Sequence, residues 1–457
     1  MGVTRTIAKF ASEVAWTTIP EAVIDIAVDH LVDSWGVMLA GSQDKGAQIL
    51  REVLGAGPGS SPVLGTSEFG GALSAACNNG LAGHALDFDD TQLSTSEDSV
   101  YGLLTHPSVP VTAAVGALAV ETGAGGRDLL TAYVAGVEVA CRVADAINRR
   151  HYQDGFHSTG TIGTIGAAVG CARLLGLGPD EMAVAIGIAA SLGAGLRENF
   201  GTMTKPLHAG RSAQNGVLAA RLAEHGFTAS QDILEAPRGF FQAAGGGFDP
   251  ATLIEHLGRP FFLEDPGVSI KPYPSGSLSH PAQDLILEIV EREGLDPADI
   301  DEVEVGTNSN VLNALIHHRP QTGLQGKFSL EYCMATGVVR RRAAISDFTD
   351  EAVLEPAIQE FIPRVRVVTD PELESLGFKH VRSRVTVVLR NGRRVQGQAD
   401  WARGYPQKKL TEAEINAKFL DCAEQALSPE AAREALDSVR GVREAPRVAD
   451  LLGHLQP

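Results

Sequence analysis

The pattern of apolar and polar residues changes along the chain and predicts two kinds of structure. From residue 1 to about 265, apolar residues recur every three or four positions, as in Val23, Ile24, Ala27 and Leu31. This spacing places them on one face of a helix. Residues 127–146 repeat the pattern. The first part of the chain is therefore predicted to be helical almost throughout.

The next part of the chain carries strand patterns. Apolar and polar residues alternate over residues 301–305 and 365–367, which is typical of strands. Two further runs, residues 385–389 and 394–398, flank the dipeptide Asn391-Gly392. Because Asn-Gly suits a tight two-residue turn, these runs are predicted to form a β-hairpin.

The helical pattern returns near the C-terminus. Thr411 and Glu414 have the spacing of a capping box, and Ile415 and Phe419 follow on one helical face. We therefore predict a mainly α protein in which residues 1–266 and 404–457 form one large all-helical domain. Residues 267–403 are predicted to form a smaller α+β domain inserted into it.

Composition excludes several kinds of partner. The 457 residues carry a formal net charge of −18, and phosphate binding needs a basic face, so nucleic acid is not expected. The charge-free stretch at residues 182–196 is shorter than the roughly 20 residues of a membrane helix. No membrane partner is expected.

The cysteines indicate the compartment. All five are far apart in the sequence, and no CxxC pair exists to suggest a zinc or redox motif. Buried free thiols are expected, and the N-terminus shows no apolar signal segment. Both observations favour a reducing cytoplasm.

The segment GHALDFDDT at residues 83–91 is the richest in chemistry. It combines His84 with the three carboxylates of Asp87, Asp89 and Asp90. Burying like charges this close is unfavourable unless each is hydrogen-bonded, paired or bound to a metal. The apolar neighbours Leu86 and Phe88 disfavour full exposure. The segment is therefore predicted to line a polar cavity.

Further segments carry histidine, lysine and tyrosine side chains that suit acid–base chemistry. Lys205 lies in a Gly/Thr-rich turn, before a helix predicted over residues 211–223, and a buried lysine there would need a carboxylate partner. No nucleophile elbow, HExxH or P-loop motif occurs. Together such groups can perform general acid–base catalysis beside a lysine-bound carboxylate. The segments are THPSVP (105–110), YQDGFHSTG (152–160), GTMTKPLHAG (201–210), KPYPSG (271–276) and KFSLEY (327–332).

In this order the segments resemble the MmgE/PrpD family, and the resemblance runs from about residue 5 to beyond residue 400. The family includes 2-methylcitrate dehydratase, cis-aconitate decarboxylase and iminodisuccinate epimerase. The resemblance implies a large helical domain, a smaller lid domain and an active site between them. It also implies a homodimer that acts on a small polycarboxylate without a metal or organic cofactor.

The resemblance assigns the candidate site residues one by one. The expected catalytic residues are Asp87, His106, His157, Lys205, Lys271 and Tyr332. The resemblance also implies Thr91 and Tyr152 as substrate-binding residues. Met203, which flanks Lys205, and His280, which follows KPYPSG, are expected to join them. One position departs from the relatives, which commonly have Cys or His five residues after the lysine that Lys271 matches. Here that residue is Gly276, which puts the exact substrate in doubt.

The family chemistry starts at a carbon next to a carboxylate. We expect a lyase like 2-methylcitrate dehydratase, in which a base removes a proton and water leaves. Lys205 and Lys271 would stabilise the enolate-like charge. An iminodisuccinate-type epimerase and a cis-aconitate decarboxylase are the alternatives. A relative that binds polycarboxylates without turnover is the non-enzyme alternative.

Overall fold

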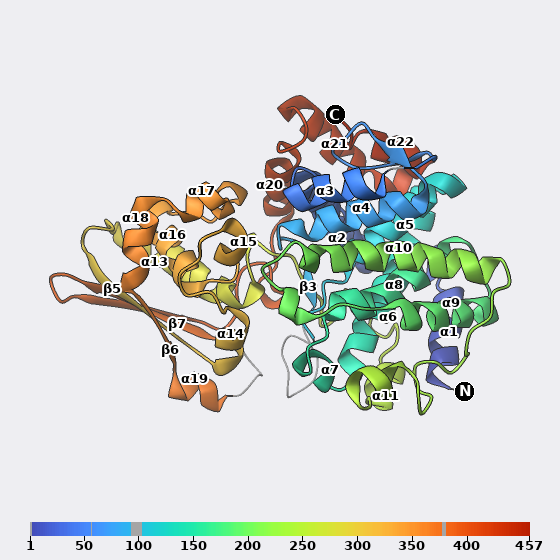
Figure 1. The fold of residues 1–457 in the computed structure, drawn as a ribbon, viewed down its shortest axis with the longest axis horizontal. Coiled ribbons are helices and arrows are strands. Elements are labelled where there is room, and N and C mark those ends of the chain that lie inside the picture. The colour runs from blue at the N-terminus through green and yellow to red at the C-terminus, as the bar shows by residue number, and fades with distance from the viewer. Residues whose placement is uncertain (1, 56, 93–102, 377–380) are drawn as a thin grey trace. The chain divides into compact units, whose positions relative to one another are not determined.

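The computed structural model describes residues 2–55, 57–92, 103–376 and 381–457. The chain forms two compact units, which we call unit 1 and unit 2 (Figure 1). Unit 1 contains the described parts of Met1–Ser94, Tyr101–Ile270 and Thr411–Pro457. Unit 2 contains the described parts of Lys271–Leu410.

Unit 1 is a packed set of helices with two short ribbons. The ribbons are β1 (Ser61–Pro62) with β2 (Phe69–Gly70), and β3 (Thr91–Gln92) with β4 (Val268–Ser269). The helices are α1 (Val3–Glu13), α2 (Glu21–Gly41), α3 (Lys45–Leu54), α4 (Ala72–Ala85), α5 (Ser108–Thr122), α6 (Gly126–Ala146), α7 (Arg150–Gln153), α8 (Ser158–Leu174), α9 (Pro179–Leu192), α10 (Thr204–Glu224), α11 (Phe240–Gly245), α12 (Pro250–Ile254), α20 (Glu412–Ala423), α21 (Pro429–Arg440) and α22 (Val448–Gly453).

Glycines let the central helices of unit 1 approach closely. A Cβ atom added at Gly210 of α10 would lie 2.4 Å from the carbonyl oxygen of Cys77 in α4. One added at Gly80 of α4 would lie 3.0 Å from the carbonyl oxygen of Ala209. No side chain fits there, so the backbones of α4 and α10 pack directly on each other. The polar residues at the ends of these helices are thereby brought together.

The C-terminal helix α20 returns to pack on α2. The predicted capping box is confirmed, because the Glu414 carboxylate accepts from the Thr411 backbone N–H at 2.8 Å and the Thr411 hydroxyl accepts from the Glu414 N–H at 3.3 Å. Further along α20, the Lys418 ammonium lies 2.5 Å from the Asp33 carboxylate of α2. The same ammonium donates to the Phe88 carbonyl at 2.7 Å.

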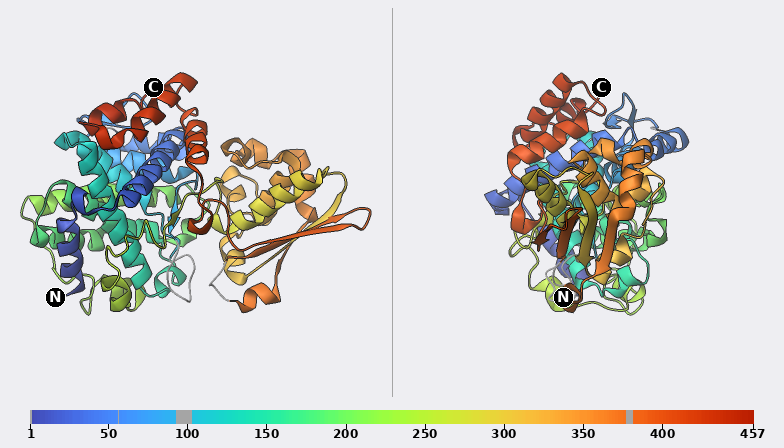
Figure 2. Two further views of the ribbon diagram at one scale, coloured as in Figure 1. Left: turned by 180° about the vertical axis from the view of Figure 1, so that it is seen from behind. Right: turned by 90° about the vertical axis from the view of Figure 1, so that its left-hand side faces the viewer.

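Unit 2 is built on a four-stranded mixed sheet with the order β6-β5-β7-β8. The strands are β5 (Ile300–Thr307), β6 (Val365–Thr369), β7 (Ser383–Leu389) and β8 (Arg394–Ala399), and β6 runs parallel to β5. Helices α13 (His280–Glu293) and α16 (Leu330–Arg340) lie on one face of the sheet (Figures 1 and 2). Shorter helices complete the unit: α14 (Ser309–Ala314), α15 (Gly323–Gly326), α17 (Asp350–Val353), α18 (Pro356–Phe361) and α19 (Pro371–Ser375).

Several predictions from the hydrophobic pattern are confirmed. The protein is mainly helical, with a small mixed sheet in its C-terminal region. The β7–β8 hairpin turns at Asn391-Gly392, where Gly392 has a φ of 84°. All five cysteines are buried free thiols. None of the described helices is both long and apolar enough to cross a membrane.

One predicted boundary is wrong. The helix expected over residues 211–223 begins at Thr204, so Lys205 lies in its first turn and not in a preceding turn. Pro206 does not stop the helix, because the first backbone N–H groups of a helix have no partner within it. Lys205 is therefore held rigidly by α10.

Candidate active site

The turn after α4 folds three acidic residues back toward the helix. Asp87 has a φ of 51°, a left-handed conformation that few residues other than glycine adopt. This reversal brings the Asp89 carboxylate to the ring of His84, with Nδ1–O distances of 2.8 and 2.9 Å. Both side chains are almost fully buried. The turn thus creates a histidine–carboxylate pair inside unit 1.

Lys205 supplies the charge partner of Asp87. Its Nζ lies 2.5 Å from Asp87 Oδ1, and both residues are at most 5% exposed. His106 Nε2 lies 3.9 Å from the same oxygen. The structure therefore brings together three of the predicted catalytic residues. The partner that a buried lysine requires is Asp87.

Four imidazoles surround these groups. His106 Nδ1 lies 3.4 Å from Asp89, and its ring centre is 4.6 Å from that of His84. The His157 ring lies 5.6 Å from His84, and its Nδ1 is 3.0 Å from Nδ1 of His208. His157 is held at the start of α8, and His208 at the first turns of α10. We call the group formed by His84, Asp87, Asp89, His106, His157, Lys205 and His208 the His/Asp/Lys cluster.

Burial keeps two of these histidines neutral. It lowers the pKa of His84 to about 4, although the Asp89 carboxylate acts in the opposite direction. Burial also lowers the pKa of His157 well below its usual value, and the neighbouring His84 and Lys205 add to this effect. Neutral imidazoles at pH 7 are able to accept protons.

Asp89 fixes the tautomer of His84. Burial alone would raise the pKa of Asp89, but His84 and His106 outweigh it and hold this pKa well below its usual value. An ionised carboxylate only accepts hydrogen bonds, so His84 Nδ1 carries the proton. His84 Nε2 is then unprotonated, and it has no hydrogen-bond partner among the described residues. This nitrogen is available as a base.

The same residues offer ligand atoms for a metal ion. The candidate ligand atoms of His84, Asp87, Asp89 and His106 lie within 4.8 Å of one another. Imidazole and carboxylate are ligands that Zn²⁺ accepts. However, the Lys205 ammonium already gives Asp87 a positive partner at 2.5 Å, and an ion would have to displace it. Metal independence stays a prediction.

A mixed aromatic and cationic wall adjoins the His/Asp/Lys cluster. Phe156 bridges to Leu196, which places α7 and its Tyr152 beside the segment that precedes α10. The Arg197 guanidinium carbon lies 3.8 Å from the centre of the Tyr152 ring. The Phe200 ring meets His157 edge-on at 5.0 Å, and Lys205 Nζ lies 5.2 Å from its centre.

Two other predicted binding residues lie in different places. Thr91 is buried in β3 opposite Ser269 of β4. Met203 is 37% exposed immediately before α10, next to Gly46 of α3. Their roles in binding substrate stay predictions.

The remaining predicted residues belong to unit 2 and are buried there. Lys271 is the first residue of that unit and is 2% exposed. His280 opens α13, where its Nε2 donates to the Ser275 carbonyl at 3.1 Å. The Tyr332 hydroxyl in α16 donates to the Asp347 carbonyl, and burial raises the pKa of this hydroxyl to about 12. The catalytic roles of Lys271 and Tyr332 and the substrate-binding role of His280 stay predictions.

Gly276 does not leave an open space. A Cβ atom added there would lie 3.0 Å from Leu315 Cδ2 and 3.6 Å from the Lys327 carbonyl oxygen. The backbone N–H of Gly276 also donates to that carbonyl at 2.9 Å. Leu315 therefore occupies the region into which the side chain of the relatives would begin. A larger residue at this position would have to move Leu315.

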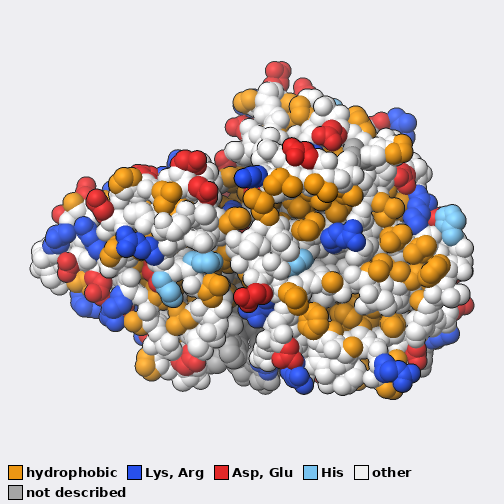
Figure 3. All heavy atoms as spheres, viewed as in Figure 1, with side chains coloured by type: hydrophobic (Ala, Val, Ile, Leu, Met, Phe, Trp, Pro, Cys, Tyr) orange, Lys and Arg blue, Asp and Glu red, His pale blue; other side chains and the backbone are white. Residues whose placement is uncertain are grey.

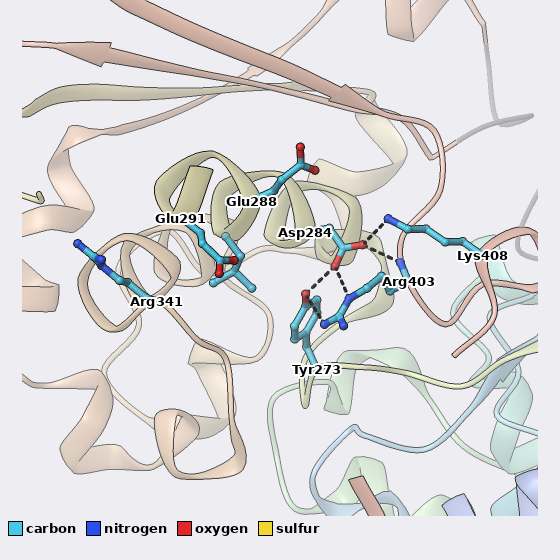
Figure 4. A pocket seen from close by; sticks show the side chains of 8 residues that line it. Tyr273, Asp284, Glu288, Glu291, Arg341, Arg403 and Lys408 are labelled. Carbon is cyan, nitrogen blue, oxygen red and sulfur yellow. Dashed lines mark hydrogen bonds and ion pairs between the residues drawn. The ribbon is translucent and has the colours of Figure 1, made fainter. Parts of the chain in front are cut away.

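Unit 2 also contains an open cavity of about 580 Å³ (Figure 4). Its central acid, Asp284, accepts from the Tyr273 hydroxyl at 2.6 Å and from the Arg403 backbone N–H at 2.7 Å. Lys408 lies 3.7 Å away on the same carboxylate. The charge of Asp284 is therefore balanced within the protein. The lining residues, which include none of those predicted as catalytic, are Tyr273, Asp284, Leu287, Glu288, Glu291, Arg341, Arg403 and Lys408.

The free energy of unfolding is expected to fall as the pH decreases from about 6.5 to about 4. Burial lowers the pKa of His84 and of His151 to about 4, from 6.5 in the unfolded chain. Between these values the unfolded chain binds protons that the folded protein does not, so acid favours unfolding. Each histidine contributes at most about 1.4 kcal/mol per pH unit.

Asp33 opposes this trend in part. Burial raises its pKa to about 6 despite the nearby Lys418, so between 3.8 and about 6 the folded state binds its proton first. Two histidines outweigh one carboxyl group, and the net slope stays positive. Urea unfolding at pH 5, 6 and 7 measures it. A free energy of unfolding that rises toward pH 5 would contradict the neutral state of these histidines.

Comparison with known proteins identifies related sequences over most of the chain. The model of the MmgE/PrpD N-terminal domain matches residues 5–253, and that of the MmgE/PrpD C-terminal domain matches residues 273–443. The chain is 26% identical to cis-aconitate decarboxylase from Homo sapiens over 379 residues, which cover 81% of this chain and 76% of that protein. It is 25% identical to cis-aconitate decarboxylase from Aspergillus terreus over 472 residues, 99% of this chain and 95% of that protein.

Proposed function

The chain belongs to the MmgE/PrpD family, and from that premise we propose that it is a lyase acting on a small polycarboxylate. The reaction would begin at a carbon next to a carboxylate. The observation that carries this proposal is the buried Lys205–Asp87 ion pair among neutral imidazoles. A fixed ammonium stabilises an enolate-like charge, and a neutral imidazole beside it removes a proton.

Dehydration is the reaction that this site supports best. A base, His84 Nε2 or His157 Nε2, takes the proton from the carbon next to the carboxylate. The electron pair of the broken C–H bond forms the new double bond, and the hydroxyl group leaves after receiving a proton from a second group. His106 is the nearest candidate for that acid, since it touches both Asp87 and Asp89. A substrate like 2-methylcitrate fits this scheme.

Decarboxylation of cis-aconitate is the second candidate, because the relatives described above carry that name. In that reaction the bond between carbon and a carboxylate breaks, and CO₂ leaves. The electron pair moves to the neighbouring double bond, and a proton adds to the carbon at its far end. This route needs a proton donor but no base for a C–H bond. The neutral state of His84 and His157 favours dehydration over it.

Incubation of the protein in deuterated water separates the two reactions. The substrates are 2-methylcitrate, citrate, cis-aconitate and iminodisuccinate, and the products are followed by NMR. We expect loss of water from 2-methylcitrate or citrate. Loss of CO₂ from cis-aconitate would establish the second candidate, and deuterium exchange with racemisation of iminodisuccinate would establish an epimerase. Binding without any turnover would contradict an enzymatic role.

Removing metal ions with a chelator tests whether the reaction is independent of metal. Because the ammonium of Lys205 already neutralises Asp87, we expect turnover to be the same before and after dialysis against EDTA. Loss of turnover that Zn²⁺ or Mn²⁺ restores would show that the four ligand residues hold a catalytic ion.

We further propose that the protein is a homodimer and that α3 and α4 form its interface. Apolar side chains gather on the surface over these helices (Figure 3). Val53 is 81% exposed, and Ile49, Leu54 and Leu73 are each more than a third exposed. Contiguous exposed apolar patches are uncommon on monomers and mark interfaces. Two further proposals rest on membership of the family: unit 2 acts as a lid domain, and Lys271 and Tyr332 are catalytic.

A Val53→Glu variant is expected to be monomeric at concentrations at which the unchanged protein is a dimer. A charge at the centre of an apolar interface is desolvated without a partner. Light scattering after size-exclusion chromatography measures the mass of the particle. Leu354→Glu is the matched control, because Leu354 is 49% exposed but belongs to unit 2. An unchanged dimer in the Val53 variant would place the interface elsewhere.

A further inference from the structure

Arg197 is a half-buried cation beside the His/Asp/Lys cluster that no predicted role includes. Its backbone N–H donates to the Gly155 carbonyl at 2.8 Å, and the neighbouring Leu196 bridges to Phe156. The main chain of Arg197 is therefore fixed to the segment that leads into His157. Its side chain is held as well, because the guanidinium stacks on the Tyr152 ring with its carbon 3.8 Å from the ring centre.

The nitrogens of this guanidinium differ in their partners. Nη1 donates to the Tyr152 carbonyl at 2.9 Å. Nε is buried and has no hydrogen-bond partner among the described residues. Arg197 also forms no ion pair with a described carboxylate. A buried N–H donor without an acceptor is unfavourable, and so is a half-buried charge without a counter-charge.

The position of Arg197 relative to Lys205 indicates which kind of group could accept a hydrogen bond from Arg197 Nε. The Arg197 guanidinium carbon lies 5.8 Å, and Lys205 Nζ 5.2 Å, from the centre of the same Phe200 ring. Both cations therefore lie close to the same aromatic side chain. Lys205 is compensated by Asp87, whereas Arg197 has no such partner within the described part of the chain. Separate carboxylates of one small molecule can reach both.

We propose that Arg197 is a specificity-determining residue that binds a carboxylate of the substrate remote from the reacting carbon. The Nε–Nη2 edge would hold both oxygens of that carboxylate, in the planar paired geometry that arginine forms and lysine does not. The stacking on Tyr152 orients this edge before the substrate arrives. The inference rests on the proposed function and deepens it. Arg197 selects molecules with a further carboxylate over otherwise equal molecules that lack it.

Two inert ligands isolate this contact. Tricarballylate is propane with three carboxylates, and methylsuccinate is the same chain without one of the end carboxylates. Calorimetry with the unchanged protein is expected to show at least tenfold tighter binding of tricarballylate than of methylsuccinate. In Arg197→Gln the affinity for tricarballylate falls about 10- to 100-fold, and that for methylsuccinate stays within twofold. Arg197→Lys retains the positive charge but not the paired N–H donors of the guanidinium. This variant is expected to recover only part of the lost affinity for tricarballylate.

A control variant separates direct contact from a general change of charge. Arg150→Gln removes the same charge from the adjacent helix α7, where Arg150 is exposed and paired with Asp154 at 2.9 Å. It is expected to bind both ligands like the unchanged protein. Thermal unfolding of Arg197→Gln and Arg197→Lys checks that both variants fold, and Arg197→Lys provides the comparison if the glutamine variant does not.

The outcomes distinguish the inference from the proposed function. If the unchanged protein turns over a polycarboxylate but the Arg197 variants bind tricarballylate normally, the inference alone is wrong. An equal loss for both ligands would also overturn it, because Arg197 would then only support the fold of the site. If the unchanged protein binds neither ligand and turns over no polycarboxylate, the proposed function fails and the inference fails with it.

Discussion

Replacing Lys205 by methionine is expected to lower kcat/KM on the true substrate by about 100- to 1000-fold. This is the usual effect of removing one fixed group that stabilises charge in a transition state. Methionine keeps most of the volume of the lysine stem, so the loss reports on the ammonium and not on a cavity. Steady-state kinetics on the substrate identified by NMR measures the effect. The exposed Lys9 provides a control, since Lys9→Met should leave kcat/KM unchanged.

The same substitution has a second effect, on stability. Without Lys205 the buried Asp87 carboxylate loses a partner at 2.5 Å. Leaving one member of a buried ion pair unpaired costs about 3–5 kcal/mol. The double variant Asp87→Asn/Lys205→Met should regain most of that stability and none of the activity. A single Lys205→Met variant with full turnover would contradict the proposed mechanism.

Asp89→Asn is expected to lower kcat by about three to four orders of magnitude, the effect seen when the acid that orients a catalytic histidine is neutralised. Asparagine can keep the shape of the contact to His84 Nδ1, but its amide group no longer fixes which ring nitrogen carries the proton. The acidic limb of the pH–rate profile should also shift, because the histidine loses a negative neighbour.

Asp90→Asn is the matched control for this prediction. Asp90 belongs to the same turn and is as buried as Asp89, but its carboxylate pairs with His30 at 2.9 Å and accepts from the Ser108 backbone N–H at 3.2 Å. Its loss should lower the temperature of unfolding and leave the shape of the pH–rate profile unchanged. If both variants lose the same activity with unchanged profiles, Asp89 only braces the turn.

The hydrophobic pattern predicted the general fold because the core of each unit is periodic in sequence. Apolar residues recur at helical spacing in α2 and α6, which are buried on nearly every side over residues 30–41 and 129–144. In β5 and β7 the most exposed positions stand between buried ones, as the alternation predicts. The start of α10 was harder to predict, because Lys205-Pro206 follows a stretch rich in Gly and Thr. A proline at this place is ambiguous, because proline residues interrupt the interior of a helix but are tolerated in its first turn.

The candidate site was predicted in part. The sequence motifs indicated Asp87, Lys205 and His157, and the structure brings these side chains into one cluster. His208 is three residues after Lys205, so its place on the same face of α10 was open to prediction from helical spacing. The pairing of His84 with Asp89 was not. This pairing depends on the left-handed backbone conformation at Asp87, which cannot be predicted from the presence of an aspartate in the sequence.

Arg197 was missed for a different reason. It stands in a polar stretch without periodicity, and its contacts join residues about 45 positions apart in the sequence. A single arginine in such a stretch is usually a solvated surface residue, so the sequence does not indicate a binding role for it. The bridge between Phe156 and Leu196, together with the hydrogen bonds of Arg197 to Gly155 and Tyr152, fixes this arginine beside the histidines.

The contact of Lys418 with the turn after α4 has a consequence for the order in which the protein is made. Lys418 donates to the Phe88 carbonyl at 2.7 Å, lies 3.9 Å from the centre of the Phe88 ring and pairs with Asp33. These residues leave the ribosome more than three hundred positions before their partner. During synthesis the turn that carries Asp87 and Asp89 therefore lacks one of its anchors until α20 has emerged, so a chain released early would retain the motif without its support.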